Sequence, residues 1–454
     1  MNVDPDGLLL HGERLTLKAF RKSARRIPAY KKILEENNVD PGTIMDIGDF
    51  RRKVPVLTKE DLFNKYELRD LCVDRSLKRM KNISTSSGSS GIFSFGLFTE
   101  KDMDEGSAAK TEVMLNHMFK IFKKKTFIIN CVPMGVRVPI STPIAEICVN
   151  PDMALEIFNK LKNEFDQIIF LADVSFLKKI LEDGIERGVD WKKESVHLIG
   201  GSDWLPETMR EYFCHILDTD WDNPERGIMM MNMGLTELYS SLGQESLSSI
   251  RIRKAARGNE ALRKDLFGDV EICPELLQYY PTQTYVESIP NKDGIHELVY
   301  SMLLKDSIAP LMRYNTKDRG TVIPYSDLRT ILSKHDLIDL LPELKLPLIA
   351  MMGRSGKGVV IDDKRISSQE ARGVLYRDFD LAAKTTGNFT LGTKGNKLTI
   401  DIQLKEKVSP SRDLEKRYAA LFSSLHSPIV KLVPYYDFHR VMTINYERKF
   451  KHVL

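Results

Sequence analysis

Between residues 19 and 34, apolar positions recur with helical spacing. Side chains three and four positions apart lie on one face of a helix, so the pattern predicts amphipathic helices in the first 80 residues. Pro41-Gly42 interrupts the pattern. Thr58, with Asp61 three residues later, predicts the N-cap of another helix.

Beyond residue 80, short apolar runs alternate with amphipathic segments. The runs expected to be strands are 126–132, 167–171, 196–199 and 227–231. The helices expected in this region are about 101–122, 151–164, 176–188 and 206–217. Strands alternating with helices of this length predict an α/β fold with a largely parallel sheet. A more β-rich stretch follows, with strands expected at 296–303 and 311–314.

The pattern changes again after about residue 355. A helix near 368–377, a strand pair at 389–391 and 397–404, a helix near 412–425 and a strand near 430–434 are expected. Together they predict a compact α+β unit large enough to be a domain. Glycines at 353, 356 and 358 permit large backbone rotations, which places the boundary there. We therefore expect a large N-terminal domain, 1–353, with mixed, mostly parallel sheets and helices, and a small mobile domain, 354–454.

Composition excludes several classes of protein. Of 454 residues, 42% are hydrophobic, which is typical of a globular protein with a sizeable core. Lys and Arg total 67 against 63 Asp and Glu, so the net charge of +4 does not suggest a nucleic-acid partner. The five widely spaced cysteines predict neither a disulfide framework nor a structural zinc site. No signal-peptide pattern or membrane-spanning apolar run is evident, so a cytoplasmic location without a membrane partner is expected.

Small residues dominate the segment from Ser84 to Gly91, Ser-Thr-Ser-Ser-Gly-Ser-Ser-Gly. Glycine lets backbone N–H groups turn toward one point, and hydroxyls add further donors. Such a nest suits the oxygens of a polyphosphate, although the Gly-Lys-Ser/Thr ending of a Walker loop is missing. A flexible Gly/Ser linker has the same composition.

Carboxylates follow two other apolar strands. Glu237 ends a Gly234-Leu-Thr-Glu sequence, and a carboxylate at the end of a buried strand could hold Mg2+. An ordinary surface glutamate is the alternative. Asp318 lies in Arg-Tyr-Asn-Thr-Lys-Asp, where its oxygens could accept hydrogen bonds from ribose hydroxyls. Gly353-Arg354 at the boundary and Lys449 in the cationic tail complete the set, although such tails are usually only solvated.

The order of these five motifs resembles the adenylate-forming superfamily of acyl-CoA ligases, firefly luciferase and peptide-synthetase adenylation domains. Two further segments look like its phenylacetate-CoA ligase-like, or CapK-like, branch. They are Pro55-Val-Leu-Thr-Lys-Glu-Asp-Leu62 and Gly200-Gly-Ser-Asp-Trp-Leu-Pro-Glu-Thr-Met-Arg210. The resemblance extends from about residue 20 to the C-terminus.

The resemblance implies a role for each motif. The β- and γ-phosphates of ATP would lie against Ser86, Ser87, Gly88, Ser89 and Gly91. Thr236 and Glu237 would set the α-phosphate and Mg2+. The adenine would be bordered by Gly200, Gly201 and Ser202, with Met233 and Gly234 nearby. Asp318 would bind the ribose, Arg354 the ribose or phosphate edge, and Lys449, or alternatively Lys451, would bridge the carboxylate and the α-phosphate.

Some positions differ from the pattern of the superfamily. Gly91 is followed by Ile92 rather than by Lys or Glu and then Pro. Met233 replaces an aromatic residue that stacks on adenine, and Lys317 replaces the Gly of a Thr-Gly-Asp pattern. Relatives that bind zinc use Cys and His between residues 238 and 312, where this chain has too few, so no zinc is expected.

The implied reaction is attack of a carboxylate on the α-phosphorus of ATP, with pyrophosphate leaving. The small domain would then rotate about residues 353–358 and expose a second face to the acceptor. Coenzyme A is the expected acceptor. An amine acceptor, or another acceptor that is not coenzyme A, is the alternative, as is a non-catalytic nucleotide-binding homologue. The sequence leaves the carboxylic acid and the oligomeric state open, a homodimer included.

Overall fold

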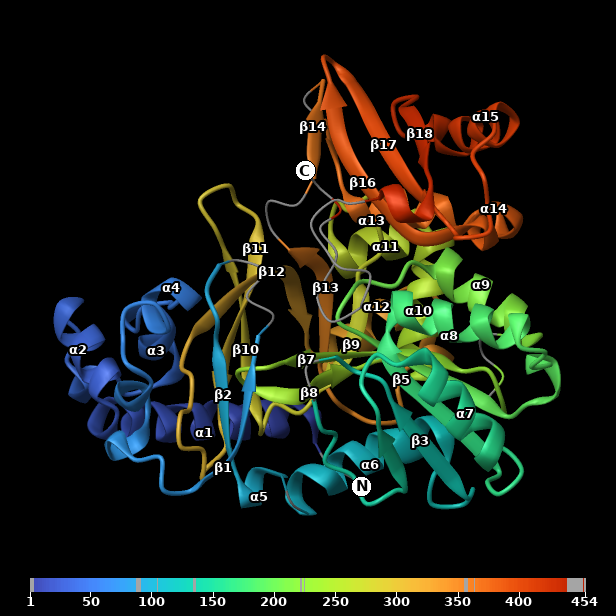
Figure 1. The fold of residues 1–454 in the computed structure, drawn as a ribbon. Coiled ribbons are helices and arrows are strands. Elements are labelled where there is room, and N and C mark those ends of the chain that lie inside the picture. Colours follow the sequence, from blue (N-terminus) through green and yellow to red (C-terminus); the bar gives the residue numbers. More distant parts are fainter. Residues whose placement is uncertain are drawn as a thin grey trace. The chain divides into compact units, whose positions relative to one another are not determined.

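The computed structural model describes residues 4–86, 91–103, 105–133, 136–220, 223, 225–354, 358–362, 364–438 and 452. The chain forms two compact units (Figure 1). The first unit contains Met1–Met118, Val136–Ser141 and Met230–Ser355, and the second contains Phe119–Gly135, Thr142–Met229 and Gly356–Leu454. The predicted division at residues 353/354 stays a prediction.

Helices open the first unit, as the apolar spacing predicts. They are α1 (Pro5–Arg26), α2 (Pro28–Glu36), α3 (Ile47–Lys53) and α4 (Lys59–Leu62). Thr58 caps α4 in a capping box with Asp61, which confirms the predicted helix start. Two further helices, α5 (Glu100–Met103) and α6 (Glu105–Phe119), follow the hairpin formed by β1 (Met80–Thr85) and β2 (Phe95–Thr99).

The main sheet of the first unit has the strand order β10-β11-β12-β13-β9-β8-β7, and the pairs between neighbours are antiparallel. In chain order the strands are β7 (Met229–Leu235), β8 (Tyr239–Gln244), β9 (Glu275–Tyr279), β10 (Thr284–Pro290), β11 (His296–Met302), β12 (Tyr314–Ile323) and β13 (Leu348–Arg354). These strands form the β-rich part that the sequence predicts after residue 231.

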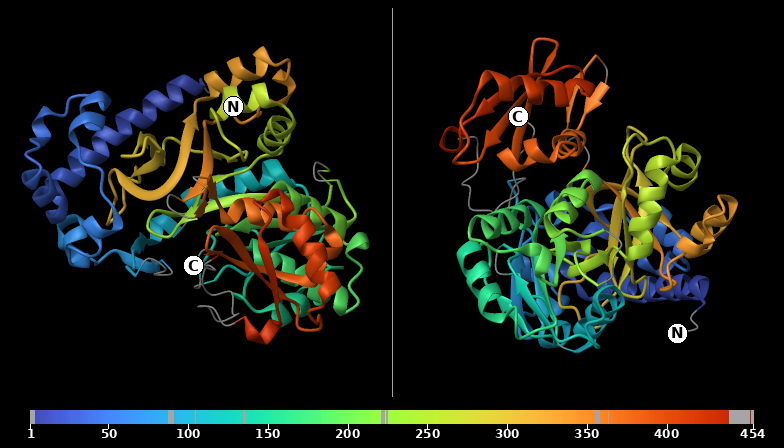
Figure 2. Two further views of the ribbon diagram at one scale, coloured as in Figure 1. Left: turned by 90° about the horizontal axis from the view of Figure 1, so that it is seen from above. Right: turned by 90° about the vertical axis from the view of Figure 1, so that its right-hand side faces the viewer.

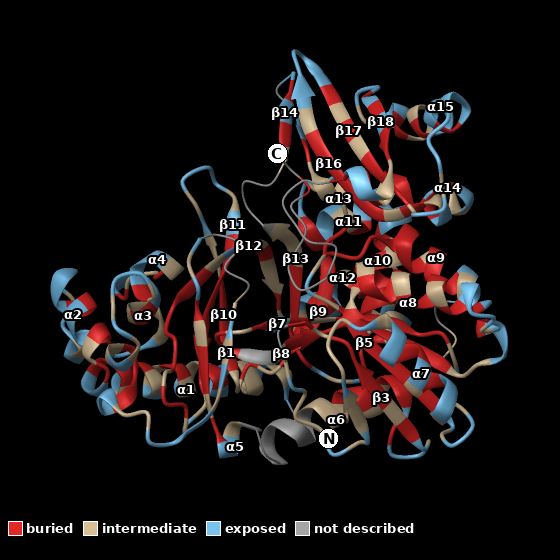
Figure 3. Cartoon of the chain, viewed as in Figure 1, coloured by how far each residue is buried: buried red, intermediate tan, exposed pale blue. Residues whose placement is uncertain are grey.

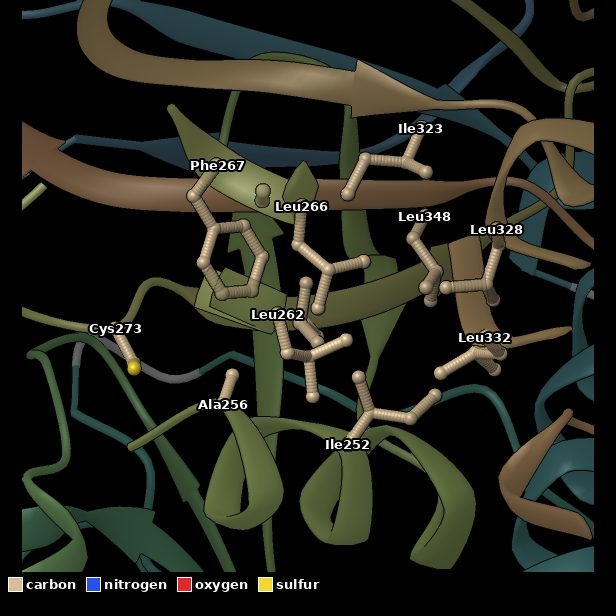
Figure 4. Close-up of a cluster of buried hydrophobic side chains, with 12 residues drawn as sticks. Ile252, Ala256, Leu262, Leu266, Phe267, Cys273, Ile323, Leu328, Leu332 and Leu348 are labelled. Atoms are coloured by element: carbon tan, nitrogen blue, oxygen red, sulfur yellow. The ribbon is translucent and has the colours of Figure 1, made fainter. Parts of the chain in front are cut away.

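An apolar core covers one part of this sheet. The helices α10 (Leu247–Gly258), α11 (Glu260–Phe267) and α12 (Tyr325–Lys334) supply buried side chains such as Ile252, Leu262 and Leu332. These pack against strand residues that include Ile323 and Leu348 (Figure 4). Burying such side chains stabilises the fold by roughly 1.5–3 kcal/mol each. None of these three helices was predicted.

The second unit contains the predicted α/β part. Its strands are β3 (Thr126–Asn130), β4 (Ile144–Glu146), β5 (Gln167–Asp173) and β6 (Val196–Gly201), in the order β6-β5-β3-β4, and all pairs are parallel. The connecting helices are α7 (Pro151–Leu161), α8 (Val174–Glu186) and α9 (Glu207–Leu217). Strand β5 (Figure 3) and strand β6 are almost wholly buried, which is typical of a parallel sheet covered on both faces.

The C-terminal part of the second unit is an α+β arrangement, as predicted. A three-stranded sheet contains β16 (Thr385–Lys394), β17 (Lys397–Leu404) and β18 (Ile429–Val433). The first pair is antiparallel and the second is parallel. Helices α13 (Ser368–Leu375) and α14 (Phe379–Lys384) contact β16, and α15 (Arg412–Leu421) contacts β18 (Figure 2). A short hairpin, β14 (Val359–Ile361) and β15 (Lys364–Ile366), precedes them.

The mixed α/β fold class is thus confirmed, but the expectation of mostly parallel sheets is wrong, because the described strand pairs of the first unit are antiparallel and the parallel pairs lie in the second unit. The strand predicted at 311–314 is wrong in position, because β12 begins only at Tyr314. Residues 311–313 belong to no strand, and Arg313, directly before β12, has a left-handed backbone (φ 47°). Among the described residues, no helix is long and apolar enough to cross a membrane.

Candidate functional site

The predicted phosphate loop is the connection between β1 and β2 in the first unit. The backbone N–H of Ser86 donates to the carbonyl oxygen of Ser94 at 3.0 Å, and the N–H of Ser94 donates to Ser86 Oγ, also at 3.0 Å. These two bonds close the hairpin at the base of the loop. Gly91 is exposed and has a left-handed backbone (φ 86°), which favours glycine. Ser87, Gly88 and Ser89 lie outside the described residues.

Glu237 lies beside this loop base and is buried, with 7% of its surface exposed. Its Oε1 accepts a hydrogen bond from Tyr314 Oη at 2.9 Å and a short one from Ser94 Oγ. Ser94 and Tyr314 are themselves almost wholly buried. A buried carboxylate is costly unless it is paired and hydrogen-bonded, so the two hydroxyls are needed to keep Glu237 in place.

Lys59 supplies the cation. Its Nζ donates to Ser86 Oγ at 3.0 Å and lies 3.8 Å from Glu237 Oε1. The strand-like residue Leu57 holds this lysine in position, because its N–H donates to the Arg313 carbonyl at 2.9 Å and its carbonyl accepts from Asn315 at 2.7 Å. Lys59 therefore joins the loop base to the carboxylate.

The described contacts of Glu237 all converge on Oε1, so Oε2 has no hydrogen-bond partner among the described residues. One fixed oxygen and one available oxygen fit the hard, oxygen-seeking Mg2+, which binds proteins through few carboxylates. The residues present thus fit the predicted metal role. Among the described residues, no group of three or more His, Cys, Asp or Glu side chains could hold a metal ion by itself.

Thr236 reaches the same place through its backbone. Ser84 Oγ donates to the Thr236 carbonyl at 3.4 Å. A Cβ added to Gly96 would lie 2.1 Å from that carbonyl oxygen, so only glycine permits this approach of β2. Met233 is buried and Gly234 is exposed in β7 just before this turn. The structure thus brings Ser86, Thr236 and Glu237 together.

Asp318 and Arg354 face each other directly across the β12–β13 pair. Residues at such positions have Cβ atoms about 4.5–5.5 Å apart. Asp318 is buried and accepts from Thr316 Oγ1 at 2.7 Å. Lys317, at the position where the superfamily pattern has glycine, takes the left-handed backbone that glycine favours (φ 64°). The role of the two residues at the ribose stays a prediction.

The arginine of the same motif has a structural role. Arg313 is buried, and its guanidinium forms a two-pronged pair with Glu287, at 3.1 Å and 2.9 Å. The third nitrogen donates to carbonyls at the end of α3, including that of Arg51 at 2.8 Å. Burial is the main cause that raises the pKa of Glu287, against the opposing effect of Arg313. Arg313 thus ties the N-terminal helices to β12.

Gly200, Gly201 and Ser202 end β6 in the second unit. Gly200 is buried, Gly201 partly buried and Ser202 exposed, with a left-handed backbone (φ 68°). Asp203 follows, and its N–H donates to the Gly201 carbonyl at 2.8 Å. This tight turn leaves the end of the strand without side-chain bulk, as expected at a ligand-binding edge of a parallel sheet. Lys449 and Lys451 lie outside the described residues.

Three contributors to the site were missed by the predictions. Lys59 and Tyr314 lie within motifs quoted for the resemblance, but nothing in their sequence context assigned them roles. Ser94 lies outside every motif. Alternating apolar and polar residues on both sides of 86–94 could have indicated a hairpin, which would have placed Ser94 opposite Ser86.

No known family model matches the chain, and no curated protein matches its sequence. Solved structures do match. The structure of 2-hydroxyisobutyryl-CoA ligase in the postadenylation state, in complex with R3-HIB-AMP, aligns with a TM-score of 0.68 at 12% identity, covering 99% of this chain and 89% of that one. The same ligase in an open conformation with 2-HIB-AMP and CoA aligns at 0.56 and 13% identity, covering 99% and 91%.

The chain has the fold of an adenylate-forming ligase. The resemblance stated from the sequence is therefore confirmed at the level of the fold, over almost the whole chain. The phenylacetate-CoA ligase-like branch stays a prediction. The roles of the individual site residues are also predictions that the alignment does not test.

Proposed function

We propose that this protein uses ATP to activate a carboxylic acid as an acyl-adenylate, releases pyrophosphate, and transfers the acyl group to coenzyme A. The observation that carries the proposal is the adenylate-forming ligase fold along 99% of the chain. The aligned ligase structures contain acyl-AMP and, in one case, CoA. The cluster around Glu237 gives this chain a site with the required charges.

Ser86 and the hairpin loop that follows it would bind the β- and γ-phosphates. Lys59 would hold Ser86 Oγ in place and contribute positive charge near them, since its Nζ lies 3.0 Å from that oxygen. Adenylation needs little covalent assistance, and catalysis depends on positioning and charge neutralisation. Asp318 and Arg354 would hold the ribose, and Gly200, Gly201 and Ser202 would border the adenine.

Glu237, with Oε2 available, would hold Mg2+, and Thr236 would set the α-phosphate. The ion supplies charge neutralisation on the phosphate oxygens when it is bound. Ser94 and Tyr314 orient the carboxylate through Oε1. Lys449 would meet the substrate carboxylate and the α-phosphate as a point charge on a flexible stem.

The test is exchange of labelled pyrophosphate into ATP over a panel of carboxylic acids, followed by product analysis with coenzyme A and then with amines. Exchange that depends on one class of acid, and thioester formation, are the expected results. Lys449→Ala should abolish exchange but spare thioester formation from a supplied acyl-adenylate, whereas Lys451→Ala should keep both.

Absence of exchange with every acid, in protein that binds ATP, would contradict the proposed activation and favour a non-catalytic nucleotide-binding protein. Exchange followed by amide rather than thioester formation would replace coenzyme A with an amine as the acceptor. Full exchange in Lys449→Ala would move the lysine assignment to Lys451.

A further inference from the structure

Arg372, on α13 in the second unit, is a buried cation with partners on two separate segments. Only 4% of its side chain is exposed. Its Nη1 donates to the Trp204 carbonyl at 3.0 Å. Its Nη2 lies 2.6 Å from Asp203 Oδ2 and 2.7 Å from His452 Nε2. One guanidinium thus connects the turn after β6 with the end of the chain.

His452 is fixed on its other side by β16. The ring nitrogen Nδ1 lies 2.9 Å from the Phe389 carbonyl oxygen, and the ring stacks on the Phe389 ring with centroids 4.5 Å apart. The Leu391 N–H donates to the His452 carbonyl at 2.6 Å. Because a carbonyl only accepts, Nδ1 carries the proton, and the unprotonated Nε2 accepts from Arg372. This tautomer satisfies the contacts of the ring with Phe389 and Arg372.

Asp203 hydrogen-bonds within the turn that Arg372 contacts. Its Oδ1 accepts from the Trp204 N–H at 2.9 Å, and its Oδ2 pairs with Arg372. Burial alone would raise the pKa of Asp203, but the charge of the Arg372 guanidinium outweighs it and holds this pKa well below its usual range. The carboxylate thus stays ionised. Both carboxylate oxygens of Asp203, the residue directly after Ser202, therefore have partners in the Trp204 N–H and the Arg372 guanidinium.

We propose that Arg372 is a positioning residue that fastens the end of the chain, through His452, to the turn following Gly200–Ser202. The inference rests on the proposed function, in which that turn borders adenine and the tail carries the adenylating lysine. Lys449 is three positions before His452, and such a length of chain spans at most about 11 Å. The Asp203–Arg372–His452 cluster limits how far the lysine can move from this turn during adenylation.

The inference is tested with Arg372→Met, which retains the apolar stem, and with His452→Ala. His452→Gln keeps an acceptor for Arg372 and is the conservative variant. Arg377→Met is the matched control, because Arg377 follows the same helix, is exposed, and its side chain donates to the Ser424 hydroxyl at 3.3 Å rather than to the Asp203–His452 cluster.

Two measurements are made on each full-length variant. The first is hydrogen exchange of the Leu391 amide, whose acceptor is His452 itself, and it needs no substrate. The second compares pyrophosphate exchange with thioester formation from a supplied acyl-adenylate. Arg372→Met and His452→Ala should accelerate exchange at Leu391 and slow adenylation by about 10- to 100-fold, the range for loss of a charge-assisted hydrogen bond. Thioester formation should change little.

His452→Gln should recover most of the adenylation rate, and Arg377→Met should match the unaltered protein. Faster hydrogen exchange at Leu391 with an unchanged adenylation rate would show that the Asp203–Arg372–His452 cluster (the anchor) holds His452 but does not position the tail, and would overturn the proposal. Equal losses in adenylation and thioester formation would overturn it too, because they indicate general damage. If the unaltered protein activates no acid, the proposed function fails, while the exchange at Leu391 still shows whether the anchor exists.

Discussion

The buried pair of Arg313 and Glu287 provides the strongest stability prediction, which depends on the first unit alone. Arg313→Ala removes two nitrogen–oxygen contacts, at 3.1 Å and 2.9 Å, and leaves the Glu287 carboxylate buried, with 6% of its side chain exposed. Removing one partner of a buried ion pair costs about 3–5 kcal/mol. Loss of the bonds to the α3 carbonyls adds to this. We expect the free energy of unfolding of the first unit to fall by at least about 3 kcal/mol.

The assay must report on the correct unit. All three tryptophans of the chain lie in segments assigned to the second unit, so tryptophan fluorescence follows that unit only. Hydrogen exchange of peptides from 284–302, measured at increasing denaturant, follows the first. For a unit of this size, the expected loss corresponds to a melting temperature lower by about 6–20 °C. Arg329→Ala, an exposed arginine on α12, is the matched control and should change little.

A double-mutant cycle isolates the uncompensated charge. Combining Arg313→Met with Glu287→Gln removes both charges and should cost clearly less than the two single substitutions added together. If Arg313→Ala lowers the stability of the first unit by less than about 1 kcal/mol, the pair is not a buried tie of the kind described. Additive costs in the cycle would contradict the reasoning as well.

Three further predictions concern the site. Lys59→Met should reduce pyrophosphate exchange by about tenfold or more, because a charge 3.8 Å from Glu237 interacts with that carboxylate by roughly 4 kcal/mol before hydration is subtracted. Lys65→Met is the exposed control. Equal exchange rates in Lys59→Met and the unaltered protein would refute the role of Lys59. Gly96→Ala should destabilise the first unit by about 1–3 kcal/mol because its Cβ would lie 2.1 Å from the Thr236 carbonyl, whereas Gly258→Ala meets nothing within 4 Å and should be tolerated. Burial and Arg372 lower the pKa of His452 below 6.5, so the folded state binds fewer protons than the unfolded chain. The Asp203–Arg372–His452 cluster therefore contributes its full stability above pH 6.5 and loses this contribution as the pH falls further. Exchange at Leu391, corrected for its intrinsic rate, should therefore quicken between pH 7.5 and 5.5, and no change would contradict the assignment.

The local pattern of the sequence determined most of the elements. Helical spacing located the N-terminal helices, and strand–helix alternation located β3, β5 and β6 in the second unit. The C-terminal α+β part also followed from periodicity and turn residues. These features depend on interactions between residues close in sequence, which a single chain displays directly.

Other features were decided by contacts between distant residues. The strand expected at 311–314 begins at its last residue instead, and Arg313 directly before it has a left-handed backbone and pairs with Glu287 on β10. The motifs pointed to Glu237, but its partners Lys59, Ser94 and Tyr314 come from three separate parts of the chain. Strand register and hairpin closure bring them together, and sequence spacing does not encode either.

The same distinction holds for the ribose pair and the chain end. Asp318 and Arg354 were each chosen from a motif, and only the register of β12 against β13 makes them face one another. No pattern marked Arg372 or His452, because a buried arginine is recognisable only when its partners are in place. The sequence determined which residue types are present to bind a nucleotide. The tertiary structure decided which residues contact the Glu237 carboxylate, which residues face each other across paired strands, and which residues contact the Arg372 guanidinium. These contacts depend on packing between elements far apart in the chain.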